Sequence, residues 1–270
     1  MAPHGQHARS AGSLAEGSPV SSIAISLIVF AFVFGGVLLG MFLHAVLPHH
    51  HLEIESKDIM KLGTGLVGTM AALILGLLVA SAKGSYDAES AELTQMSANV
   101  DMLDRILALY GPETKDARLL LQGSVERILE TMWSSSDDSA APMAPPASGG
   151  EVLFERIQAL SPTTDAQRTL QAQALSLAID LGKTRWLMYE QAGSSVSIPL
   201  LIVVVLWLTV IFVSFGIFAP FNATAIGSLI VAAVSVSGAI FLILEMYTPY
   251  SGVVQVSSAP LRAALAQLGR

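Results

Sequence analysis

Histidines and carboxylates gather in one short stretch of the chain, residues 47–58, which reads LPHHHLEIESKD. Imidazole and carboxylate groups are ligands of many metal sites, so His49, His50 and His51 are candidates for a metal-binding cluster. Consecutive histidines point in different directions on a helix, although two could chelate together from an extended segment. Because the stretch separates two apolar segments, we expect a solvated turn rather than a metal site. In that position the histidines could still sense pH at the mouth of a pore.

A second candidate is Glu245, which lies near the end of the last apolar segment. A carboxylate within a membrane segment is a candidate functional group by default. This one is two residues from the segment's end, beside Tyr247, where it can reach water. We favour an anchor at the membrane interface. The alternative is an ion contact at a pore mouth, where a negative charge would favour cations.

Catalytic motifs are missing from the sequence. It contains no phosphate-cradling glycine-rich loop, no G-x-S-x-G and no H-E-x-x-H, and its six histidines all fall within the first 51 residues. We therefore expect neither an enzyme nor a cofactor. Cysteine is also absent, which excludes disulfides and thiolate chemistry, and the net charge of −7 argues against nucleic acid as a partner.

The composition is that of a membrane protein. Hydrophobic residues make up 53% of the 270 and charged residues 13%, against about 25% charged in ordinary soluble domains. Mean hydropathy is +0.62. Four apolar blocks each reach the length of about 20 residues that a helix needs to cross a bilayer: 23–46, 62–82, 198–219 and 222–247. The first block is about twice as long as the core of a signal peptide, so we expect an uncleaved helix. The sequence predicts an all-α integral membrane protein with four transmembrane helices in contact with the lipid bilayer.

These spans divide the chain. We predict a polar tail (1–22), a transmembrane hairpin (23–82), a helical cytoplasmic domain (83–197) with a flexible linker (134–150), a second hairpin (198–247) and a C-terminal tail with a short amphipathic helix (248–270). Four crossings put both termini and 83–197 on one face of the membrane. Only Lys57 and Lys61 of the 14 Lys and Arg residues fall on the opposite face, which favours cytoplasmic termini.

The predicted cytoplasmic domain has helical periodicity. A seam of apolar residues recurs at steps of three and four: Leu93, Met96, Val100, Leu103, Leu107 and Tyr110. Gly111-Pro112 ends this helix, and further helices are expected at about 113–133, from about 151, and at about 165–191. No strong helix breaker separates span two from the seam, so one helix could run from the membrane into the domain. The seam fits intramolecular packing and a contact between subunits equally well.

Span two carries two patterns on different faces. Gly68, Ala72, Gly76 and Ala80 repeat at every fourth position, which lets helix backbones approach closely in lipid. We expect this small-residue face to contact neighbouring helices. A second interpretation adds an apolar constriction that gates a pore by dewetting, formed by Met70, Ile74 and Leu77. Packing alone is the favoured interpretation.

Several stretches together resemble a bacterial membrane family described as bestrophin-like. They are LGLLVASAKGSYD, AELTQMSANVDMLDRILALYGPETKDAR, DAQRTLQAQALSLAIDLGKTRW and SVSGAIFLILEMYTPYSG, and the resemblance covers roughly residues 45–268. Bestrophins themselves are pentameric anion channels with four membrane helices and a helical cytoplasmic region between spans two and three. Their second span lines the pore with aromatic side chains, whereas span two here has none. The acidic run that binds calcium in the animal proteins is not evident either.

The resemblance implies a homo-oligomeric ion channel or permeation protein in the bacterial cytoplasmic membrane, with ions as a partner. The alternative is a membrane scaffold or sensor whose cytoplasmic helices recruit a partner. Ion flux through liposomes would favour the channel, and a copurifying cytoplasmic protein would favour the scaffold.

Overall fold

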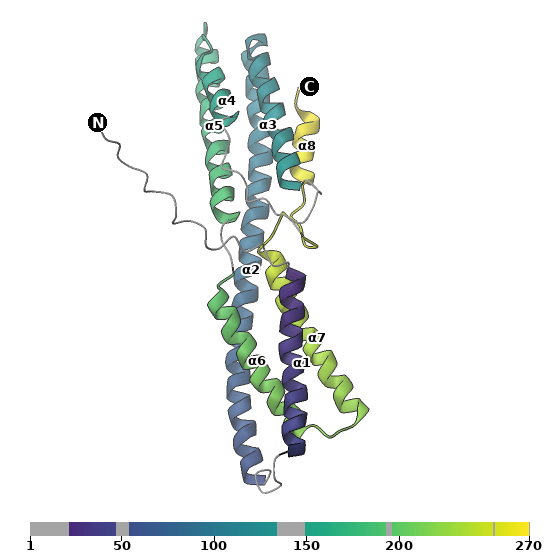
Figure 1. Cartoon of the computed structure of the whole chain (residues 1–270). Coiled ribbons are helices and arrows are strands. Elements are labelled where there is room, and N and C mark those ends of the chain that lie inside the picture. Colours follow the sequence, from purple (N-terminus) through teal and green to yellow (C-terminus); the bar gives the residue numbers. More distant parts are fainter. Residues whose placement is uncertain (1–21, 47–53, 134–148, 193–195, 251, 270) are drawn as a thin grey trace, which may run out of the picture.

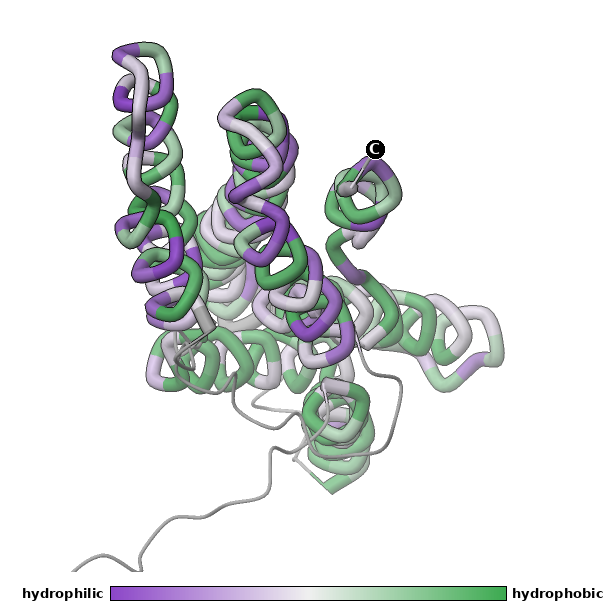
Figure 2. Tube along the Cα trace, turned by 90° about the horizontal axis from the view of Figure 1, so that it is seen from above, coloured by the Kyte–Doolittle hydropathy of each residue, from purple (hydrophilic) through white to green (hydrophobic). Residues whose placement is uncertain are grey.

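A computed structural model describes residues 22–46, 54–133, 149–192, 196–250 and 252–269. These ranges fold into helices and connecting segments, and they contain no β-strand. The molecule is elongated, with a lower bundle of apolar helices and an upper group of more polar helices, and one long helix runs through both (Figure 1). Seen from above, the polar residues concentrate on the upper helices (Figure 2). The predicted all-α membrane fold is confirmed.

Four helices are long and apolar enough to cross a membrane. Three of them lie within the lower bundle: α1 (Ser22–Val46), α6 (Ile198–Phe218) and α7 (Ala223–Met246). The fourth is the first part of α2 (Ile54–Tyr110), which contains the predicted span 62–82. The start of α1 and the end of α7 both lie at the level where the upper helices begin (Figure 1). The four predicted spans are thus helical.

Glycines set the closest approach in the membrane bundle, between α1 and α6. A Cβ on Gly36 would meet the carbonyl oxygen of Thr209 at 3.0 Å, and a Cβ on Gly40 would collide with that of Val213. Gly216 on α6 faces Gly40 in the same way. Helices associate in lipid through such close packing, because the lipid tails are as apolar as the side chains. The α1–α6 pair is therefore the tightest part of the bundle.

The helix α2 is 57 residues long, which corresponds to about 85 Å. It continues without interruption from the membrane through Gly84 into the upper domain, as the lack of a breaker before Lys83 predicted. A helix this long is held straight by the elements packed along it rather than by its own propensity. It therefore links the membrane bundle and the upper domain mechanically.

The chain reverses direction at Gly111, as predicted. Gly111 has a φ of 137°, a conformation that L side chains rarely adopt. The 3₁₀ turn η2 (Pro112–Thr114) follows, and the buried Thr114 hydroxyl donates to the carbonyls of Leu107 (2.6 Å) and Gly111 (2.8 Å). These bonds satisfy carbonyls that the end of α2 leaves free. The helix α3 (Lys115–Trp133) then runs back along α2 (Figure 1).

The upper domain is completed by α4 (Gly149–Gln158), α5 (Asp165–Ala192) and α8 (Ala259–Gln267). At the start of α5, the Thr164 hydroxyl accepts from the Gln167 amide (3.1 Å) while the Gln167 side chain accepts from Thr164 (3.4 Å). This reciprocal pair is a capping box. It explains why the helix begins at the predicted residue.

All six seam residues of α2 are buried within the chain, against α3, α4, α5 and α8. The intramolecular interpretation of the seam is therefore confirmed. The C-terminal helix belongs to the same core, because Leu261 and Ala264 of α8 are fully buried there. Most of the predicted linker (134–148) and the N-terminal tail (1–21) lie outside the described residues.

Candidate functional site

Span two, residues 62–82 of α2, packs against the other membrane helices with one narrow face. Ala71, Leu78 and Ala82 are buried there. The Thr64 hydroxyl shares a 2.9 Å hydrogen bond with the Ser214 hydroxyl of α6, where a polar side chain in lipid would otherwise lack a partner. Only 17% of the most apolar stretch of α2 is buried, against 28–39% in the other three spans. Span two is thus the least covered of the four.

The predicted small-residue face is not the one that α2 uses inside the chain. Ala72, Gly76 and Ala80 are exposed and Gly68 is half-buried. A Cβ on Gly68 or Gly76 would meet nothing within 4 Å. Close packing within the chain uses the glycines of α1 and α6 instead. Contact of the span-two face with a second chain stays a prediction.

The three residues of the predicted constriction divide between two faces. Met70 and Leu77 point away from the bundle, with exposed fractions of 46% and 63%. Ile74 is partly buried and packs against the membrane core. Leu66 and Leu73 are exposed alongside Met70 and Leu77. We call these four residues, together with Ala72, Gly76 and Ala80, the open face of span two.

Glu245 holds the segment that follows α7. Its exposed fraction is only 4%, so it does not reach water as we expected of an interface residue. Its carboxylate accepts hydrogen bonds from the backbone amides of Val253 (2.5 Å) and Val254 (3.4 Å). Gly252 has a φ of 85°, and a Cβ there would collide with the same carboxylate. The structure thus gives Glu245 a loop-anchoring position, and its role as an ion contact stays a prediction.

The segment anchored by Glu245, residues 247–250 and 252–258, is called here the junction loop, because it joins the membrane bundle to the upper domain. Three of its contacts reach other elements. They are Tyr247 hydroxyl with Ser81 (3.0 Å), Gln255 carbonyl with the Tyr86 hydroxyl (3.1 Å), and Val256 carbonyl with the Trp133 indole N–H (3.0 Å). The junction loop is therefore fastened to α2 and α3 at the point where α2 leaves the membrane.

A pair of acidic side chains lies under the junction loop. Glu89 is 3% exposed, and its Oε2 has no hydrogen-bond partner, nor do the Glu92 Oε2 and the Tyr250 hydroxyl. Glu92 uses its other oxygen to accept from Gln191 of α5 (2.8 Å). Burial raises the pKa of Glu89 to about 7, while the nearby Tyr250 hydroxyl lowers it and the charge of Glu92 raises it. Burial also raises the pKa of Tyr250.

Sequence reasoning missed Glu89, although a signal was present. The seam of α2 steps back by four residues from Leu93 to Glu89, so the periodicity that marks the buried face also marks this carboxylate. What the sequence did not indicate is that the junction loop, about 160 residues later, would cover it.

The family model for the bestrophin-like domain matches residues 30–261, from the third turn of α1 to the first turn of α8. The chain belongs to the bestrophin-like family. Comparison with curated proteins and with solved structures finds no significant match. The match to this family confirms the resemblance drawn from the sequence, and it includes span two, the junction loop and both acidic residues beneath it.

One predicted site of this bestrophin-like protein cannot be placed. The histidines His49, His50 and His51 lie outside the described residues, and their roles as a metal or pH contact stay predictions. In the part of the chain that the structure describes, no group of three or more His, Cys, Asp or Glu side chains is arranged to hold a metal ion.

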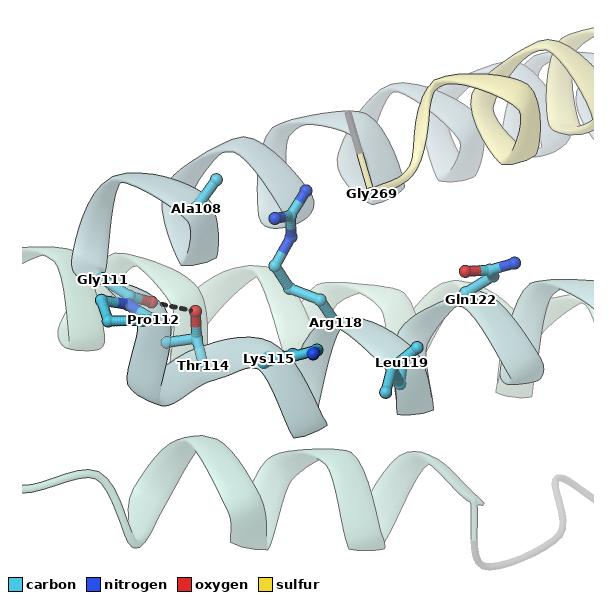
Figure 3. Close-up of a pocket in the computed structure, with 9 residues that line it drawn as sticks. All are labelled: Ala108, Gly111, Pro112, Thr114, Lys115, Arg118, Leu119, Gln122 and Gly269. Atoms are coloured by element: carbon cyan, nitrogen blue, oxygen red, sulfur yellow. Dashed lines mark hydrogen bonds between the residues drawn. The ribbon is translucent and has the colours of Figure 1, made fainter.

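A pocket of about 420 Å³ lies at the far end of the upper domain, between the end of α2, the start of α3 and Gly269 (Figure 3). Arg118 points from α3 toward α2 across this pocket (Figure 3). Its guanidinium donates twice to Asp104 of α2, at 2.7 and 2.8 Å. This bidentate pair neutralises the arginine. Arg118 is therefore part of a structural ion pair rather than a free charge for a ligand.

Proposed function

We propose that this bestrophin-like protein is an ion-permeation protein that works as an assembly of identical chains. Its setting would be a bacterial cytoplasmic membrane, with the upper domain and both termini in the cytoplasm. Membership of the bestrophin-like family supports this proposal. So does the similarity of its architecture to that of bestrophin channels, in which the second span lines the pore.

The observation that carries the proposal is the open face of span two. A transmembrane helix that faces lipid on one side needs only one buried face. The helices α6 and α7 already contact span two on its other side. Yet the open face combines a row of small residues with a row of bulky ones. Small residues favour close approach of another helix. Bulky apolar residues such as Met70 and Leu77 could then narrow an axial path between chains.

The test is ion flux through liposomes that contain the assembled protein. We expect chloride or potassium flux in the wild type, and a clear change in its rate when Leu77→Ala or Met70→Ala widens the constriction. Leu27→Ala is the matched control, because the exposed fraction of Leu27 (62%) is close to that of Leu77 (63%) but Leu27 lies on α1. Flux that responds equally to all three variants would contradict a path along span two.

A second candidate function is a membrane scaffold, favoured by exposed apolar side chains on the upper helices. Met102 and Leu109 on α2 and Trp186 on α5 are each more than half exposed. If these side chains recruit a cytoplasmic protein, that protein should copurify with the wild type and be lost from a Met102→Glu/Leu109→Glu variant. Ion-tight vesicles that contain the assembled protein would favour this function over permeation.

A further inference from the structure

Glu89 lies on α2 close to Tyr250 of the junction loop and to Glu92, and these two neighbours contact α3 and α5. It is about two helical turns beyond the end of span two. The junction loop covers it with Tyr250, whose ring stands edge-on to Trp133 of α3 with centroids 5.6 Å apart. Gln191 of α5 binds its neighbour Glu92. A change at Glu89 would therefore reach the membrane span and the upper domain together.

A buried negative charge requires a counter-charge or hydrogen-bond donors, and the carboxylate of Glu89 is poorly supplied with both. Within the described residues, no lysine or arginine forms an ion pair with Glu89 or Glu92. Burying a charge without a counter-charge is costly, and an unsatisfied buried acceptor adds to that cost. One proton on Glu89 would remove one of the two negative charges. It would also supply an O–H donor to a place where the acceptor Glu92 Oε2 has no hydrogen-bond partner.

We propose that Glu89 is a proton-binding site that fastens the junction loop to α2. With the proton bound, the neutral carboxyl group donates a hydrogen bond to the free Oε2 of Glu92, and Tyr250 stays packed on Trp133. Without the proton, the buried charge of Glu89 lies near the like charge of the half-buried Glu92. Their repulsion and their need for water loosen Tyr250 and the loop that carries it.

The direction of the pH dependence follows from the environment of Glu89. Its pKa is raised to about 7 in the folded protein, so the fastened state is complete in mild acid and is lost as the pH rises through about 7. The titratable groups that act on it are Glu92, on the same helix, and Tyr250, on the junction loop. Trp133 of α3, which contacts Tyr250, and Gln191 of α5, which binds Glu92, do not titrate. Lys83 and Asp87 are exposed on α2 and pair with each other.

Trp133 provides a reporter of this site. The chain has three tryptophans. In a Trp186→Phe/Trp207→Phe variant, Trp133 is the single remaining tryptophan, and it contacts Tyr250. We expect its fluorescence, measured on the full chain in detergent between pH 5 and 9, to change in one step with a midpoint near pH 7. Glu89→Gln should abolish the step. Asp87→Asn, which removes an exposed carboxylate two residues away, should leave it in place.

Two further variants test the site even if Glu89→Gln does not fold. Glu92→Gln removes a like charge and should move the midpoint to lower pH. Tyr250→Phe removes a hydroxyl that favours the charged form, and it should move the midpoint to higher pH. A flat profile in the wild type, a step that persists in Glu89→Gln, or midpoints that do not shift in opposite directions would overturn the proposal. So would a step that disappears on adding a chelator, since that would indicate a metal ion.

The same site would regulate ion flux, and this consequence rests on the proposed function. We expect the pH dependence of flux to share the midpoint of the Trp133 signal and to vanish in Glu89→Gln. A pH-dependent change in Trp133 fluorescence without any ion flux would contradict the permeation proposal but not the proton-site proposal. Flux without the step would contradict the proton site alone.

Discussion

At the scale of single residues, glycines decide how closely α1 and α6 can approach. Gly40 of α1 faces the backbone of α6, where a Cβ would lie 2.9 Å from the Cα of Gly216. Backbone atoms cannot rotate away as a side chain can, so any larger residue must push the helices apart. The close packing of α1 against α6 therefore requires a glycine at position 40.

We predict that Gly40→Leu destabilises the protein by about 3 kcal/mol, the upper end of the usual cost of overpacking. Thermal unfolding in detergent, followed by circular dichroism, measures this cost. Gly35→Leu is the control, because Gly35 lies on the same helix and a Cβ there meets nothing within 4 Å. Equal unfolding temperatures for the two variants would contradict the close α1–α6 contact.

The sequence pattern indicated a row of small residues on span two as a helix contact, whereas the closest packing within the chain uses glycines of α1 and α6. Gly36 and Gly40 have the same four-residue spacing as Gly76 and Ala80. Spacing indicates only that a face permits close approach, and which helix approaches depends on the tertiary arrangement. Glu245 illustrates a similar limit, because its burial depends on the fold of the loop that follows it.

At the scale of elements, α2 is the feature that the sequence predicted best. Its apolar span, its seam and its end at Gly111-Pro112 all depend on local patterns, and the structure joins them into one helix. The junction loop was not predicted, because its contacts with Ser81 and Tyr86 link residues more than 160 positions apart. No local pattern marks such a contact.

The continuity of α2 can be tested at Gly84, which lies between the membrane span and the upper domain. Gly84→Pro would remove a helix hydrogen bond and clash with the preceding turn, so we expect a loss of about 3 kcal/mol. Gly84→Ala should instead stabilise the protein by up to about 1 kcal/mol, because a Cβ there meets nothing within 4 Å. Thermal unfolding of the two variants checks both expectations. If proline were tolerated as well as alanine, α2 would not act as one continuous helix.

At the scale of the whole molecule, the helix α2 and the junction loop are two of the connections between the bundle and the upper domain. Both pass close to Glu89, and the open face of span two lies on the same helix, on the membrane side of Glu89. A conformational change in the upper domain can therefore be transmitted to span two along α2, and the proposed proton site lies between the two.

Cysteine modification tests the central claim, an ion path along the open face of span two, most directly. The chain contains no cysteine, so Leu77→Cys, Met70→Cys and the control Leu27→Cys each introduce a single thiol. Each variant is assembled in liposomes, and ion flux is measured before and after a charged thiol reagent is added. We expect the reagent to change flux through Leu77→Cys and Met70→Cys and to leave Leu27→Cys and the wild type unaffected. Assembled protein that passes no ions, or flux through Leu77→Cys and Met70→Cys that the reagent does not alter, would contradict the account.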